Sequence, residues 1–129
     1  MSEDRYKIGM ELLTKVDGEI GKTVLNSLKE IAPDLSKYLI EFAFGDIYGR
    51  KGLDPVQKEL ITLASLTTQG GCELELTVHI NASLNIGLAP KQIVDAIIHC
   101  LPYTGFPRVL NSINVAKKVF ESRSLKVEG

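Results

Sequence analysis

The sequence has little of what several functional classes require. It contains no tryptophan, only 6% aromatic residues, and a formal net charge of −1. A stacking platform for single-stranded nucleic acid needs aromatic side chains, and binding to phosphate backbones needs a basic surface. No apolar run approaches the roughly 20 residues of a membrane-spanning helix. We therefore expect neither a nucleic-acid partner nor a membrane association, and a small-molecule substrate becomes the natural alternative.

Cysteine is also scarce, because only Cys72 and Cys100 are present. Two cysteines are too few for a disulfide scaffold, and a reducing compartment fits this composition. Residues 1–7 are largely charged and lack the apolar segment of a secretory signal, so we expect a cytoplasmic protein. The 129 residues are expected to form a single domain, 1–129, that buries a sufficient core without covalent links.

Glycine and proline divide the chain into pieces of helical length. Within each piece, apolar residues recur at the spacing of one helix face, and no stretch shows the strict alternation of a strand. The predicted helices span about residues 4–16, 22–31, 33–48, 56–68, 72–86, 90–101 and 108–120. The expected fold is all-α, a compact bundle of about six or seven helices.

A polar stripe lies on the predicted helix 72–86. Cys72, Glu75, His79 and Ser83 fall within about 80° of one another at about 100° per residue. Glu75 is a helical neighbour of both Cys72 and His79, so a Cys72–Glu75–His79 network is predicted. A neighbouring carboxylate favours the protonated imidazole, which suits His79 for proton transfer near neutral pH.

The state of the Cys72 thiol stays open at this point. The amino end of a helix favours a thiolate, whereas the carboxylates of Glu73 and Glu75 disfavour it. A free cysteine more often behaves as a small buried hydrophobic residue, which is the structural alternative. No metal site is expected, because these ligand types differ in softness and lack a second His–Cys pair. No cofactor is expected either, since Gly70 and Gly71 lack the strand and lysine of a phosphate-binding loop.

Several segments resemble, in the right order, the carboxymuconolactone decarboxylase family. They are residues 53–55 with 58–64 (LDP, KELITLA), 73–79 (ELELTVH), 85–88 with 92–96 (NIGL, QIVDA) and 103–107 (YTGFP). The resemblance covers about residues 33–121. It implies an alkylhydroperoxidase D-like, all-helical fold that assembles as homotrimers or homohexamers.

The same resemblance implies two chemistries. One branch of the family decarboxylates a carboxylated muconolactone, and the other reduces hydroperoxides with a C-x-x-C pair and a histidine four residues further on. Here the first cysteine corresponds to Cys72, the histidine to His79, and Glu75 stands in place of the second cysteine. A disulfide cycle within this motif is therefore impossible, although Cys100 or an external thiol could resolve an oxidised Cys72.

The leading hypothesis is a decarboxylase-like lyase that acts on a small carboxylated lactone. His79 would donate the proton and Glu75 would orient it. Arg108 is the candidate for binding a substrate carboxylate, because a guanidinium pairs with one through two parallel hydrogen bonds. Tyr103 and Glu59 complete the candidate substrate-binding residues.

Two alternatives remain beside it. A thiol-dependent hydroperoxide reductase, with peroxiredoxin-like activity, would use Cys72 as the nucleophile. A non-catalytic oligomeric binding protein would need none of this chemistry. In each case an oligomer is expected, because the segments 55–66 and 91–101 are apolar on more than one face. The resemblance implies that this oligomer is a homotrimer or a homohexamer.

Overall fold

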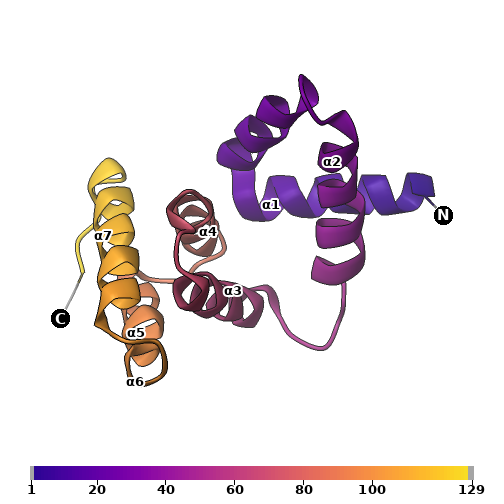
Figure 1. Cartoon of the computed structure of the whole chain (residues 1–129). Helices are drawn as coiled ribbons and strands as arrows, with labels where there is room; N and C mark the ends of the chain where they lie inside the picture. Colours follow the sequence, from indigo (N-terminus) through magenta and orange to yellow (C-terminus); the bar gives the residue numbers. More distant parts are fainter. Residues whose placement is uncertain (1, 128–129) are drawn as a thin grey trace. The chain divides into compact units, whose positions relative to one another are not determined.

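The structure, a computed structural model, describes residues 2–127, and side chains are described for residues 4–127. Within this range every regular element is a helix, which confirms the all-α prediction. Seven α-helices and one π-helix follow one another along the chain (Figure 1): α1 (Ser2–Lys29), α2 (Pro33–Tyr38), η1 (Leu39–Tyr48), α3 (Pro55–Gln69), α4 (Glu73–Asn85), α5 (Pro90–His99), α6 (Leu101–Thr104) and α7 (Phe106–Ser122).

Contacts divide the chain into two compact units, an N-terminal unit of Met1–Pro55 and a C-terminal unit of Val56–Gly129. The N-terminal unit begins with α1, which joins the two helices predicted over 4–16 and 22–31. Between the two predicted helices, Gly18 alone departs from helical geometry, as a kink with φ 64° and ψ −142°. Because glycine tolerates positive φ, one residue changes the helix direction without a connecting loop.

The helices α1 and η1 cross at very short range within the N-terminal unit. A Cβ atom at Gly9 would collide with the carbonyl oxygen of Ile40, and one at Gly45 would lie 2.6 Å from the carbonyl oxygen of Arg5. Arg5 also binds Asp46 through Nε–Oδ1 and Nη2–Oδ2 contacts of 2.9 and 2.7 Å. Backbone therefore packs on backbone here, and the predicted single α-helix over 33–48 is instead α2 followed by the π-helix η1.

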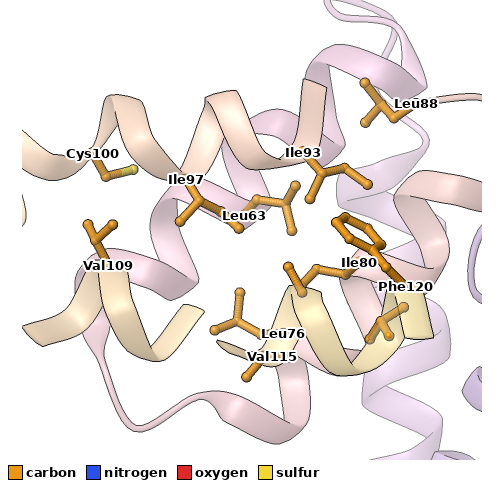
Figure 2. Packing of buried hydrophobic residues seen from close by; sticks show 12 residues of the cluster. Leu63, Leu76, Ile80, Leu88, Ile93, Ile97, Cys100, Val109, Val115 and Phe120 are labelled. Atoms are coloured by element: carbon orange, nitrogen blue, oxygen red, sulfur yellow. The ribbon is translucent and has the colours of Figure 1, made fainter. Parts of the chain in front are cut away.

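The C-terminal unit contains one continuous apolar core (Figure 2). Every helix of this unit except the short α6 supplies fully buried side chains to it, and α7 packs against both α4 and α5. The core residues are Leu63, Leu76, Ile80, Leu88, Ile93, Ile97, Cys100, Val109, Val115, Ala116, Val119 and Phe120. The predicted helices 56–68, 72–86, 90–101 and 108–120 correspond to α3, α4, α5 and α7 within two residues at each end.

The short helix α6 was not predicted. Pro102 suggested that the preceding helix ends there, but it occupies one of the first two positions of α6, where a missing N–H costs nothing. Within residues 2–127, none of the helices combines the length and apolar character that crossing a bilayer requires.

Candidate functional site

The turn between α3 and α4 places the Cys72 thiol at the amino end of α4. Gly70 and Gly71 both adopt left-handed backbone conformations, with φ of 73° and 70°. Cys72 is the residue that caps α4, and its thiol is partly buried. Its Sγ lies 3.4 Å from the carbonyl oxygen of Gly70 and 4.0 Å from Oε1 of Gln69. The thiol is thus held by weak S–H contacts to the turn that precedes the helix.

The main polar contact of the site joins two helices. His79 on α4 contacts Glu59 on α3, with 3.0 Å between Nδ1 and Oε1. The Glu59 side chain is 0% exposed, and that of His79 is 19% exposed. A carboxylate oxygen accepts hydrogen bonds, so an ionised Glu59 pairs with the tautomer of His79 that carries a proton on Nδ1. Glu59 therefore fixes both the orientation and the tautomer of the imidazole.

Glu59 is an unusual residue for its position. It shares the buried face of α3 with Leu63 and Thr67, at intervals of four residues. Among the described residues, neither its second oxygen, Oε2, nor the hydroxyl of Thr67 has a hydrogen-bond partner. Burying a polar oxygen without a partner costs stability, so packing alone does not account for a glutamate at this position. A charged residue on the inner face of an otherwise apolar helix was the sequence signal for this role.

Glu75 lies elsewhere than the predicted network requires. Its side chain is exposed and makes no hydrogen bond or ion pair with the side chains of residues 4–127. The structure thus brings His79 together with Glu59, and does not bring it together with Glu75. Helical spacing made Glu75 a neighbour of His79 but carried no information about α3, which supplies the carboxylate. Ser83, the last residue of the predicted stripe, is buried and donates to the carbonyl oxygen of His79 at 2.7 Å.

Arg108 lies beside the same turn as Cys72. It is an exposed residue in the first turn of α7, and its side chain passes over Gly70. Nearby, the hydroxyls of Thr68 and Thr104 lie 3.1 Å apart, which links the end of α3 to the end of α6. Tyr103 on α6, the other candidate substrate-binding residue near this turn, is 80% exposed.

The second cysteine lies in the hydrophobic core. Cys100 is buried, its thiol donates to the carbonyl oxygen of Ala96 at 3.5 Å, and it faces Val109 (Figure 2). Burial raises the pKa of this thiol, which disfavours the reactive thiolate. Both cysteines are free. In the part of the chain that the structure describes, no three His, Cys, Asp or Glu side chains gather into a group that could hold a metal ion.

The described residues thus form an all-helical protein in which a buried carboxylate on α3 contacts a histidine on α4, and a thiol and a guanidinium lie at the turn that joins these two helices. The sequence profile of the carboxymuconolactone decarboxylase family matches residues 33–118, and the chain belongs to this family. A similar protein is the 4-carboxymuconolactone decarboxylase of Acinetobacter baylyi, 32% identical over 128 residues that cover 98% of this chain and 94% of the relative.

Two further relatives are more distant or shorter in coverage. The nitrosuccinic acid decarboxylase of Metarhizium robertsii is 31% identical over 98 residues, which cover 74% of this chain and 68% of that protein. An uncharacterized 15.0 kDa protein of Paracoccus denitrificans is 22% identical over 113 residues, which cover 87% of this chain and 84% of the relative.

Proposed function

We propose that the protein is a decarboxylase, specifically a carboxy-lyase that acts on a small carboxylated lactone. Two of the similar proteins carry the name of a decarboxylase, and one of them aligns with nearly the full chain. The observation that carries the proposal is the 3.0 Å contact between Glu59 and His79, because decarboxylation requires a positioned proton donor.

In this reaction, the bond between the carboxylate carbon and the lactone carbon breaks and carbon dioxide leaves. The bonding electron pair stays on the carbon skeleton, where a double bond shifts, and one proton must be delivered to complete the product. His79 is the donor. Since Nδ1 is engaged by Glu59, proton transfer to the substrate falls to Nε2. Glu59 stabilises the imidazolium before the transfer and keeps the ring in place during it.

The remaining predicted residues take supporting roles. Arg108 binds a substrate carboxylate, and the exposed Tyr103 hydroxyl is a hydrogen-bond donor for the lactone. Glu59, predicted as a substrate-binding residue, has no exposed surface and acts through His79 instead. Glu75 and Cys72, which the sequence predicts as catalytic residues, carry out no step of the mechanism proposed here.

The protein is further proposed to assemble as a homotrimer or homohexamer. The two segments expected to be apolar on more than one face do leave large apolar side chains exposed, Ile61 at 56% and Ile98 at 48%. Phe106 and Leu110, one turn apart on α7, are 64% and 59% exposed. Adjacent exposed apolar side chains are typical of surfaces that a symmetric partner covers.

The test is a decarboxylation assay on carboxylated muconolactones that follows carbon dioxide release. Wild-type protein is expected to turn over at least one of them, and His79→Gln is expected to lower kcat about 10²–10⁴-fold, the usual contribution of a general acid. Cys72→Ser serves as the matched control on the same helix, because thiol chemistry plays no part in this mechanism. Equal rates for wild type and His79→Gln, or a loss only in Cys72→Ser, would contradict the proposal.

A further inference from the structure

From the contact between Arg108 and Gly70 we infer that Gly70 is a positioning residue, which seats the Arg108 guanidinium for a carboxylate that the substrate keeps through the reaction. This inference rests on the proposed decarboxylase function. A Cβ atom at Gly70 would lie 2.6 Å from Nε of Arg108, 3.2 Å from Cδ and 3.4 Å from Cγ. The stem of the arginine therefore crosses directly over the glycine, in a space that any other residue would fill.

Both sides of this contact are held in place by the fold. On one side, the carbonyl oxygen of Gly70 accepts the weak hydrogen bond from the Cys72 thiol at 3.4 Å. On the other side, the 3.1 Å contact between Thr68 and Thr104 fixes the turn that leads into α7. Arg108 follows in the first turn of α7, so the path of its side chain is set by backbone that is already anchored.

The guanidinium itself has no internal partner. Arg108 is exposed and forms no hydrogen bond or ion pair with any side chain in the range 4–127. A planar guanidinium binds a carboxylate through two parallel hydrogen bonds, which a lysine cannot reproduce. A seated arginine without a counter-ion is therefore suited to an incoming carboxylate.

The chemistry of decarboxylation identifies which carboxylate this is. The departing group loses its negative charge as carbon dioxide forms, so a strong ion pair to it would stabilise the ground state more than the transition state. A carboxylate that is retained in the product keeps its charge throughout and gains binding energy without that penalty. Arg108 is therefore assigned to the carboxylate that a carboxylated muconolactone keeps, rather than to the one that it loses.

Two adjacent glycines give a matched pair of variants. Gly70 and Gly71 have nearly equal positive φ, 73° and 70°, so alanine at either position meets similar backbone strain. A Cβ atom at Gly71 would meet nothing within 4 Å, whereas one at Gly70 would displace Arg108. The difference between Gly70→Ala and Gly71→Ala thus isolates the effect on the arginine, which moves at little cost because its far end is flexible.

In steady-state kinetics with a dicarboxylated lactone, Gly70→Ala is expected to raise KM at least about tenfold over Gly71→Ala, the scale of a charge-assisted pair, with kcat within about twofold. In an Arg108→Ala background the two glycine variants should have equal KM. Equal KM values for the two glycine variants in the presence of Arg108 would overturn the inference.

A second readout needs no turnover. The ¹⁵N-labelled Nε–Hε signal of Arg108 is followed by NMR while succinate, a simple dicarboxylate, is added. The signal should respond in wild type and Gly71→Ala, and should be displaced and unresponsive in Gly70→Ala. If this pattern is seen but no lactone is turned over, the role of Gly70 in positioning Arg108 stands and the proposed reaction is contradicted. A wild-type signal that ignores succinate, or identical behaviour of both glycine variants, would overturn the inference itself.

Discussion

The helices of the N-terminal unit and those of the C-terminal unit pack through different kinds of contact. In the N-terminal unit, α1 and η1 meet backbone to backbone at Gly9 and Gly45, where no side chain fits. In the C-terminal unit, side chains such as Leu63, Ile80 and Ile97 interdigitate in a core with essentially no exposed surface. The N-terminal unit therefore depends on glycines without side chains at the helix contact, whereas the C-terminal unit depends on large apolar side chains that fill the space between helices. The candidate site residues Glu59, His79 and Arg108 all lie in the C-terminal unit, on α3, α4 and α7.

The largest expected effect on stability comes from the core of the C-terminal unit. Ile80 is 0% exposed, and Ile80→Ala should lower the free energy of unfolding by about 2–5 kcal/mol through lost burial and a residual cavity. Urea unfolding followed by circular dichroism measures it. The matched control is Ile61→Ala at a 56% exposed position, which should cost far less. Similar losses for both would contradict the core described here.

The same titration tests whether the chain is one domain, as predicted from its length. Tyr6, Tyr38 and Tyr48 belong to the N-terminal unit, and the fourth tyrosine, Tyr103, to the C-terminal unit. Tyrosine fluorescence therefore reports mainly on the first unit, whereas circular dichroism reports on both. Coincident transitions in Ile80→Ala are expected for one cooperative domain, and separate midpoints would show that the two units unfold independently.

The second largest expected effect on stability comes from the contact between α1 and η1 at Gly9. Gly9→Ala places a methyl group against the Ile40 carbonyl, which is backbone and cannot swing away, so a loss of about 1–3 kcal/mol is expected. Gly52→Ala is the control, because a Cβ atom there meets nothing within 4 Å. That variant should be neutral or gain a few tenths of a kcal/mol from reduced chain entropy. A neutral Gly9→Ala would mean that the helices do not cross so closely.

The smallest expected effect is a pH dependence from Cys100. Because burial raises the pKa of its thiol in the folded protein, the folded state holds this proton more tightly than the unfolded chain does. The resulting stability is fully present below the unfolded pKa, about 8.5, and is lost as pH rises through the folded value. Cys100→Ala should flatten the alkaline limb of a plot of unfolding free energy against pH. An unchanged alkaline slope would contradict the buried placement of this thiol.

The same contrast between the units shows what the sequence could predict. In the C-terminal unit, local signals placed the four longer helices but not α6: Gly70 and Gly71 separate α3 from α4, and Gly87, with φ 106°, follows α4. In the N-terminal unit, periodicity predicted an α-helix where η1 is a π-helix, because a tight crossing with another helix is not encoded in apolar spacing. The site was also predictable only in part. Helix geometry correctly put Cys72 and His79 on the same helix, but it could not identify Glu59, the partner of His79, which lies 20 residues away in sequence on α3.

We propose that Glu59, rather than Glu75, holds the His79 imidazole in place for proton transfer. The direct measurement is kcat as a function of pH for Glu59→Gln and Glu75→Gln, which make the same chemical change at a buried and an exposed carboxylate. Glu59→Gln is expected to lose at least about 10²-fold in kcat. The alkaline limb of the pH profile, where the general acid loses its proton, should shift toward lower pH, because the imidazolium loses the carboxylate that stabilises it. Glu75→Gln should keep the wild-type rate and profile. A wild-type profile in Glu59→Gln, with the loss appearing in Glu75→Gln, would contradict the account.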